Sequence, residues 1–247
     1  MVLGEKRNVP PLINNVMMKT GTVHVLVVSG FNVGIVAFIT NLLLKLLRLK
    51  RKPRIVFTIL FVITYCFMTG ASNPVLRATI MAIFFLSGYL IKREPDVYYS
   101  LSLAALFILS LNPLQLFDIG FQLSFASVFA IIFLYPRLKK LIRIEKLKFP
   151  AGRYIVDNLL VSFSAWIGTA GIILANFRIF SPITVLANIF VVPLATLITL
   201  CGFGLIFTQA IGFLNVIPFA PVLELLVNML LKVNIFLSNL PAAWISF

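Results

Sequence analysis

The chain has 247 residues, of which 61% are hydrophobic and 11% are charged, and its mean hydropathy is +1.07. This composition lies far outside the range of soluble globular proteins and predicts an all-α, polytopic membrane protein. The formal net charge of +14 favours anionic partners such as phospholipid or nucleic acid. The positions of the basic residues along the chain indicate whether this charge sets membrane topology or binds a ligand.

The first 22 residues are too polar and too short to cross a membrane. Pro11 suits the first position of a helix, and Gly21 suits a C-terminal cap. One face of the intervening turns is apolar, formed by Leu12, Ile13, Val16 and Met17. The sequence therefore predicts that residues 1–22 form a short helix on the membrane surface and its lead-in.

Apolar runs account for most of the remaining chain, and most of them approach the ~20 residues that a membrane-spanning helix needs. We expect seven or eight spans, because the shorter runs include incomplete ones. Asn188 and Pro193 interrupt the seventh run, which allows a broken helix there. The eight runs are 23–44, 55–70, 75–91, 97–111, 117–135, 155–176, 182–208 and 222–240.

The basic residues gather in alternate connections between these runs. Of the 21 Lys and Arg residues, six lie at 45–54, two at 92–93 and seven at 137–153. Basic connections stay in the cytoplasm, so this alternation predicts cytoplasmic connections at 45–54, 92–96 and 136–154 and an N-terminus outside. Anionic ligand binding is a secondary use of the same residues.

The chain offers little for catalysis. It has one histidine and seven carboxylates, and it lacks the His-Glu-x-x-His, Cys-x-x-Cys and Gly-x-Ser-x-Gly spacings. We therefore expect no enzyme activity, no cofactor and no catalytic metal. Nor does a phosphate-binding loop that could couple nucleotide hydrolysis appear.

Polar residues inside or beside the apolar runs are the remaining candidates, because such residues are costly in lipid and often mark a transport path. Arg77 and Asp118 both lie near the predicted outer ends of their helices, where they can pair. Asp118 and Gln122 are four residues apart and share a helix face. Glu224 and Lys232 share a face of the last run, where ion pairs with other helices are expected.

Purely structural roles remain open for some of these polar and small residues. Gly30 and Gly34 have the spacing of small residues that let two membrane helices pack closely, with Ser29 bonded to its own helix. Arg77 can simply extend its side chain to the membrane surface.

Four segments of the chain resemble a known family, the ComEC/Rec2 competence proteins of DNA uptake. The likeness covers residues 20–200 clearly, and it resides in Thr20-Gly-Thr-Val-His-Val-Leu-Val-Val-Ser-Gly-Phe-Asn-Val33, Thr69-Gly-Ala-Ser-Asn-Pro-Val-Leu-Arg-Ala-Thr-Ile-Met81, Asn112-Pro-Leu-Gln-Leu-Phe-Asp-Ile-Gly-Phe-Gln-Leu-Ser-Phe125 and Ser181-Pro-Ile-Thr-Val-Leu-Ala-Asn-Ile-Phe-Val-Val-Pro-Leu194.

The resemblance implies that residues 1–247 are one competence domain, a channel that carries single-stranded DNA across the bacterial cytoplasmic membrane during natural transformation. It implies membrane lipid as its surroundings, and DNA-receptor, nuclease and cytoplasmic motor proteins as partners. The family's usual second histidine is replaced here by Asn32, and neither the OB-like nor the metallo-β-lactamase-like domain of many members is expected in this chain.

Combining these arguments, we expect a DNA path that is lined by polar or small residues from four parts of the chain. A secondary transporter or permease for a small anionic or lipid-like solute is the competing hypothesis. The candidate path residues are His24, Ser29, Gly30, Asn32, Ser72, Asn73, Arg77, Asp118, Gln122, Ser124 and Asn188.

Overall fold

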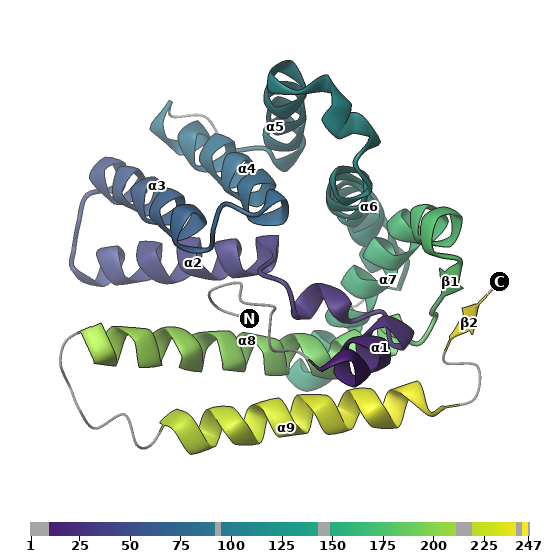
Figure 1. Cartoon of the computed structure of the whole chain (residues 1–247). Helices are drawn as coiled ribbons and strands as arrows, with labels where there is room; N and C mark the ends of the chain where they lie inside the picture. The colour runs from purple at the N-terminus through teal and green to yellow at the C-terminus, as the bar shows by residue number, and fades with distance from the viewer. Residues whose placement is uncertain (1–9, 92–94, 143–148, 211–218, 241–243, 247) are drawn as a thin grey trace. The chain divides into compact units, whose positions relative to one another are not determined.

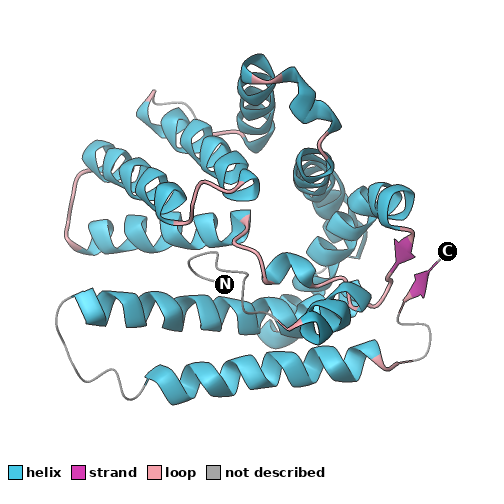
Figure 2. Ribbon diagram, viewed as in Figure 1, coloured by secondary structure: helices cyan, strands magenta, loops and turns pink. Residues whose placement is uncertain are grey.

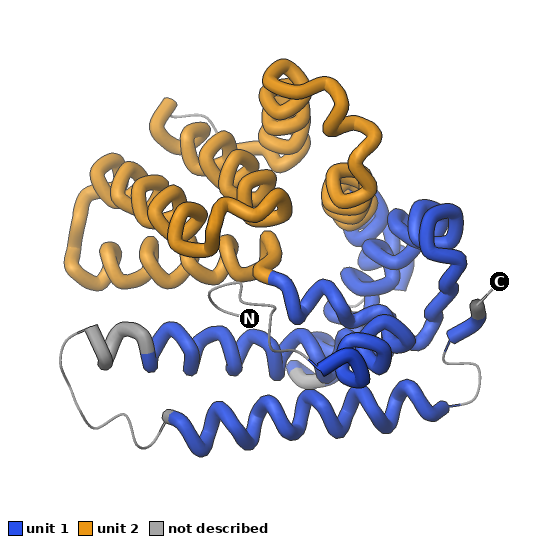
Figure 3. The backbone as a smooth tube through the Cα atoms, viewed as in Figure 1, with its two compact units in different colours: residues 1–27, 133–247 blue, residues 28–132 orange. Residues whose placement is uncertain are grey.

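The computed structural model describes residues 10–91, 95–142, 149–210, 219–240 and 244–246. Nearly all of these residues are helical, apart from short loops and two strands of two residues each (Figure 2). The helices form two compact units, unit 1 (residues 1–27 and 133–247) and unit 2 (residues 28–132), which Figure 3 colours blue and orange. The all-α prediction is confirmed.

Unit 2 is a series of helices joined by short turns. It contains α2 (Gly30–Leu46), α3 (Arg51–Met68), α4 (Asn73–Leu90), α5 (Val97–Leu111), the 3₁₀ helix η2 (Pro113–Phe117) and the start of α6 (Ile119–Ile142) (Figure 1). The α3 helix packs against α2 and α4, and α4 also packs against α2 and α5. Short turns make successive helices antiparallel. The starts of α2 and α4 and the ends of α3 and α5 therefore lie at one end of unit 2.

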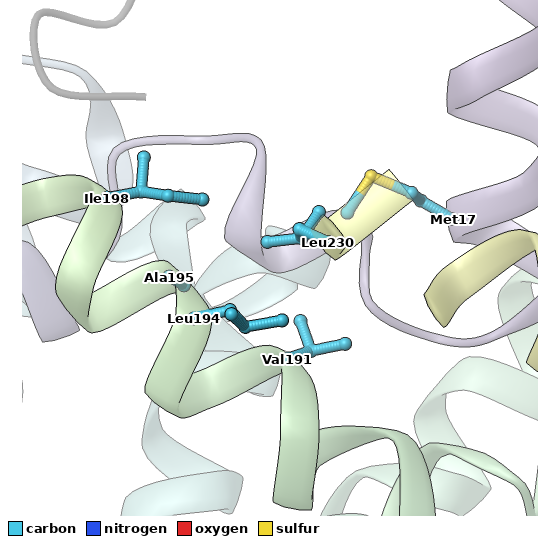
Figure 4. Close-up of a cluster of buried hydrophobic side chains, with 6 residues drawn as sticks. All are labelled: Met17, Val191, Leu194, Ala195, Ile198 and Leu230. Carbon is cyan, nitrogen blue, oxygen red and sulfur yellow. The ribbon is translucent and has the colours of Figure 1, made fainter. Parts of the chain in front are cut away.

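Unit 1 combines the N-terminal segment with the second half of the chain. It contains α1 (Pro11–Lys19), the 3₁₀ helix η1 (Val23–Val25), the end of α6, α7 (Pro150–Phe177), α8 (Thr184–Ala210) and α9 (Phe219–Ser238). Strands β1 (Ile179–Phe180) and β2 (Ile245–Ser246) pair antiparallel. A cluster of buried hydrophobic side chains joins α1, α8 and α9 (Figure 4), and it consists of Met17, Val191, Leu194, Ala195, Ile198 and Leu230.

The first helix begins and ends as its sequence predicts. Pro11 occupies the first helical position. After the last turn, the Gly21 N–H bonds the Met18 carbonyl and the Thr22 N–H bonds the Met17 carbonyl. This pattern is a Schellman cap, with Gly21 at φ +69°. Met17 is fully buried on α1, so one face of this helix packs against the protein.

The eight apolar runs correspond to α2 through α9 in the described part of the chain. Five of these helices are long and apolar enough to cross a membrane: α4, α6, α7, α8 and α9. The apolar helices α2 and α5 are shorter, with 17 and 15 residues, and α3 starts with three cationic residues in its first four. The number and length of these apolar helices make the chain a multi-pass membrane protein.

The first apolar run is not one helix, contrary to our expectation. Residues 23–25 form η1, and α2 begins only at Gly30, after Ser29 in extended conformation (φ −116°, ψ 173°). His24 consequently lies in a short turn and not in a spanning helix. The neighbouring Thr20 and Thr22 both donate to Asn234 of α9, a tertiary contact that a hydropathy pattern does not reveal.

The seventh run is not broken, which is a second difference. The α8 helix continues from Thr184 to Ala210 with Pro193 inside it. Proline removes one backbone donor, but membrane helices tolerate it where neighbouring groups compensate. Near this point, Thr196 Oγ1 donates to the Val192 carbonyl, one residue before Pro193, and Thr199 Oγ1 donates to the Ala195 carbonyl, two residues after it.

Candidate functional site

A buried arginine links two helices of unit 2. Arg77 lies in the second turn of α4 and is 4% exposed. Its Nη1 is 3.4 Å from Asp118 Oδ1, and its Nε donates to Ser124 Oγ at 3.3 Å. The expected pairing of Arg77 with Asp118 is therefore present. The Asp118 side chain is 41% exposed, so the pair has one buried and one accessible member.

Local sequence around Asp118 builds this cluster. Asp118 directly precedes α6, and its Oδ1 accepts the Phe121 N–H at 2.7 Å, which caps the first turn of the helix. A Cβ at Gly120 would lie 2.9 Å from Arg77 Nη2, closer than side chains allow. The glycine thus makes room for the guanidinium against the first turn of α6. Upstream, Asn112 Oδ1 caps η2 by accepting the Leu114 N–H.

A second polar contact joins α2 to α3. Asn32, where the resemblance implies a histidine in other members, is 5% exposed and hydrogen-bonds the equally buried Tyr65. Nearby, a Cβ on Gly30 would lie 3.1 Å from the Ala78 side chain on α4, so Gly30 allows a close approach of the two helices. A Cβ on Gly34 would contact nothing within 4 Å, so the packing interpretation holds for Gly30 alone.

Four more candidates lie near the same end of unit 2. Ser29 and Ser72 directly precede α2 and α4, and neither side chain caps its helix. Asn73, the first residue of α4, is exposed. Gln122, in the first turn of α6, donates from Nε2 to the Leu116 carbonyl at 3.0 Å. Unit 2 therefore gathers nine of the eleven candidates around the starts of α2, α4 and α6 and the end of α3.

The other two candidates, His24 and Asn188, belong to unit 1. His24 is exposed, and its Nδ1 is 3.1 Å from the Gly21 carbonyl oxygen. Asn188 Oδ1 is buried and has no hydrogen-bond partner among the described residues. From the sequence we expect His24 to gather with Arg77 and Asp118 at the outer entrance of the path, and this stays a prediction because His24 and Arg77 lie in different units.

Unit 1 contains a buried polar network that sequence reasoning missed. Thr20, Thr22 and Asn234 are all fully buried. Asn234 Oδ1 accepts Thr20 Oγ1 at 2.8 Å and Thr22 Oγ1 at 2.7 Å, and Asn234 Nδ2 donates to the Leu230 carbonyl. The partners are more than 210 positions apart, so no local pattern announces the contact. Only the polar character of Asn234 inside an apolar run could have drawn attention to it.

The turn between β1 and α8 also holds the N-terminal segment through hydrogen bonds. Ser181 Oγ donates to the Lys19 carbonyl at 2.6 Å, while the Ser181 carbonyl accepts Trp166 Nε1 and Thr184 Oγ1. A Cβ on Gly21 would lie only 2.0 Å from Thr184 Oγ1. Residues 19–22 therefore contact the β1–α8 turn on one side and Asn234 of α9 on the other.

Few of the charged side chains in the described part of the chain form ion pairs. Within the described residues the ion pairs are Arg77 with Asp118 and Lys139 with Asp157. Glu224 and Lys232 are exposed and form no ion pair there, so the expected ion pairs between α9 and other helices are not found among these residues. The same part of the chain brings no three His, Cys, Asp or Glu side chains together that could hold a metal. The polar groups of the site can donate hydrogen bonds and balance charge.

Comparison with known proteins gives several relatives. ComE operon protein 3 of Bacillus subtilis (strain 168) is 32% identical over 202 residues, which are 82% of this chain and 25% of that protein. An uncharacterized protein of Aquifex aeolicus (strain VF5) is 31% identical over 201 residues, 80% of this chain and 44% of the relative. Recombination protein 2 of Haemophilus influenzae is 24% identical over 142 residues, 55% of this chain and 18% of the relative.

The chain therefore spans less than half the length of these curated relatives. No solved structure matches it. The family model described as "Competence protein" matches residues 1–247, the whole sequence. The chain belongs to the competence protein family.

Proposed function

We propose that this chain forms a membrane path through which single-stranded DNA crosses the bacterial cytoplasmic membrane during natural transformation. The observation that carries the proposal is the competence-family match along the entire chain. The resemblance in its four motifs implies the same role. A polyanion that leaves water needs hydrogen-bond donors along its way. The end of unit 2 that holds the nine candidates, which we call its polar end, offers such donors.

Within this proposal, the polar end of unit 2 is the outer entrance. Asn73 is exposed there and can donate to phosphate, and Gln122 lies at the start of α6. Arg77 is buried behind Asp118, so its first role is to neutralise the half-exposed carboxylate and hold α6 against α4. An unneutralised carboxylate at that place would repel the phosphates of DNA.

The proposed topology has the N-terminus outside, α1 on the outer surface and seven or eight spans. The helices α2 and α5, at 1.5 Å per residue, reach about 26 and 22 Å, short of the ~30 Å hydrocarbon core, so they require local thinning of the bilayer or flanking polar residues at the interface. The cytoplasmic connections are 45–54, 92–96 and 136–154, of which residues 92–94 and 143–148 lie outside the described residues.

Cysteine labelling tests this topology. In a chain in which Cys66 and Cys201 are replaced by alanine, single cysteines at Lys50 and Lys140 should resist an impermeant maleimide added to intact cells. They should react after the membrane is permeabilised. Labelling of either position from outside would reverse the orientation.

The basic connections should serve topology more than conduction. Lys139 Nζ lies 3.5 Å from Asp157 Oδ1, but both side chains are partly exposed, and water and salt screen such surface pairs so that they add little to stability. We expect Lys139→Gln and Lys140→Gln to leave DNA uptake within a few-fold of the wild-type level. Loss of uptake by either variant at normal membrane abundance would instead assign these residues to DNA or a motor protein.

The permease hypothesis has lost part of its support. It relied on a broken helix around Pro193 and on ionised groups inside the membrane bundle, whereas α8 is continuous and Glu224 and Lys232 are exposed. The buried, unpartnered Oδ1 of Asn188 is compatible with either function. We therefore retain the DNA path, without enzyme activity or cofactor, with the receptor, nuclease and motor supplied by other proteins or domains.

A transport assay distinguishes the two functions. A naturally transformable bacterium that lacks its own competence-family membrane protein receives either this chain or a chimera in which the chain replaces the matched region. Entry of labelled DNA into a nuclease-resistant cytoplasmic pool supports the DNA path. Normal insertion of both proteins without DNA entry would contradict it.

A further inference from the structure

An apolar groove in unit 2 has no role in the proposed DNA path. It has a volume of about 310 Å³ and is lined by α4, α5 and α6, through Met81, Ala82, Phe85, Val97, Ser100, Leu101 and Val128. It lies toward the end of α4 and the start of α5, the end of unit 2 opposite to Arg77.

The groove is unsuited to water and to nucleic acid. Ser100 is its one polar lining residue, and the Ser100 hydroxyl already donates to the Asp96 carbonyl at 2.9 Å. A water molecule needs two to four polar partners, and a phosphate needs donors or cations. The space equals about ten water-sized volumes, and a methylene is of similar size, so it can hold about ten carbons of an acyl chain.

Two aromatic rings connect the groove to a cationic side chain, Arg51. Phe85, which lines the groove, packs edge-on against Tyr89 with their ring centroids 5.8 Å apart. The Arg51 guanidinium lies over the Tyr89 ring, 4.7 Å from its centroid. Arg51 is exposed at the start of α3, beside the equally exposed Lys50 and Lys52. An acyl chain in the groove would therefore bring its headgroup close to a guanidinium held in place by an aromatic ring.

Among the residues that the structure describes, few acidic side chains compete for this cation. The described carboxylates of unit 2 are Asp96 and Asp118. Asp118 is paired with Arg77, and Asp96 Oδ1 accepts the Tyr98 N–H at the start of α5. A planar guanidinium binds phosphate through two parallel hydrogen bonds, so a phosphate headgroup is the ligand that this cation fits.

We propose that unit 2 binds one anionic phospholipid, with an acyl chain in the groove between α4, α5 and α6 and its phosphate at Arg51. An acyl chain gains little hydrophobic free energy over the surrounding bilayer, because lipid tails are equally apolar. Selection of the lipid therefore comes from the headgroup. The basic residues of the α2–α3 connection lie where the phosphates of the cytoplasmic leaflet would be under the proposed topology, although the site itself does not depend on DNA transport.

Native mass spectrometry of the full chain in detergent tests this site. The probes are phosphatidylglycerol and phosphatidylcholine with identical acyl chains, at equal concentration. We expect one phosphatidylglycerol to be retained, about fivefold in preference to phosphatidylcholine, which corresponds to about 1 kcal/mol for one basic side chain at an anionic lipid. Arg51→Gln should remove this preference, and Lys52→Gln, the matched loss of charge one residue away, should keep it.

Filling the groove should expel both lipids. Ala82→Phe and Val128→Phe fill it from α4 and from α6, and Leu103→Phe adds an aromatic ring at a position of α5 that is 48% exposed and outside the groove. Circular dichroism establishes that each variant is folded, and the proposal predicts loss of bound lipid in either folded groove variant and retention in Leu103→Phe.

Three results would overturn the proposal. The first is full retention of phosphatidylglycerol by a folded groove-filled variant. The second is equal loss with Lys52→Gln and Arg51→Gln, which would indicate general attraction by a basic surface. The third is displacement of the lipid by a second copy of the chain or by a short oligonucleotide, which would assign the surface to a dimer or to DNA.

Discussion

Replacing Arg77 by alanine is expected to abolish DNA uptake while the protein still inserts in the membrane. The substitution removes the cation and leaves Asp118, 41% exposed, as an uncompensated negative charge at the proposed entrance. It also removes the Nε contact to Ser124, and with it the link from α4 to α6. Uptake of labelled DNA, measured at matched membrane abundance, checks the result.

Two further variants separate the roles of Arg77. Arg77→Lys should restore uptake only in part, because lysine keeps the charge but cannot bond Asp118 and Ser124 through a planar fork. The double variant Arg77→Ala with Asp118→Asn should take up more DNA than Arg77→Ala alone, because it also removes the repelling charge. Lys232→Ala, at an exposed cation that forms no ion pair in the described structure, is the matched control and should be near normal.

Near-normal uptake by Arg77→Ala would remove this residue from any functional role. Complete rescue by lysine would show that Arg77 supplies only a positive charge. An equal defect in the double variant would mean that repulsion by Asp118 is not the cause, and that the helix contact or direct phosphate binding by Arg77 matters instead.

Replacing Gly21 by alanine is expected to cause the largest loss of stability in unit 1. A Cβ there would lie 2.0 Å from Thr184 Oγ1, and the backbone is at φ +69°. The left-handed conformation alone costs a non-glycine residue about 1–2 kcal/mol. The clash must in addition displace the turn before α8 or pull Thr20 and Thr22 away from Asn234, which would leave buried polar groups without partners at about 1–3 kcal/mol each.

Gly70 supplies a matched control for this prediction. Its φ is +73°, but a Cβ would contact nothing within 4 Å. Gly70→Ala should therefore show the backbone cost alone. Thermal unfolding in detergent and abundance in the membrane compare the two variants, and equal destabilisation by both would refute the tight contact between Gly21 and Thr184.

Much of the fold follows from local sequence. Runs of apolar residues predict each helix from α2 to α9, since a membrane leaves helices as the main way to satisfy backbone hydrogen bonds. Pro11 and Gly21 predict the limits of α1, because their own backbone preferences determine where a helix begins and ends. The pairing of Arg77 with Asp118 followed from the cost of leaving either charge alone in apolar surroundings.

Other features depend on contacts that no local pattern encodes. Hydropathy continues through residues 23–29, so it could not reveal that His24 is in a turn outside α2. The turn follows a segment held by Asn234, which is more than 200 residues away in the sequence. Pro193 suggested a break, but α8 continues through it, as membrane helices can when neighbouring groups satisfy the freed backbone. Glu224 and Lys232 were expected to form ion pairs with other helices, but a shared helix face does not reveal that both side chains are exposed.

Transport of single-stranded DNA by the purified chain in proteoliposomes tests the central claim most directly. Labelled single strands are added outside vesicles under a membrane potential that is positive inside, and protection from external nuclease is measured against empty vesicles and vesicles with Arg77→Ala. We predict that single strands are protected in vesicles with the wild-type chain and not in empty vesicles or in vesicles with Arg77→Ala. Duplex DNA should gain little protection in any of them. Transport of a small anion without any protection of single strands, by a chain shown to be folded and inserted, would contradict the DNA path and favour a permease.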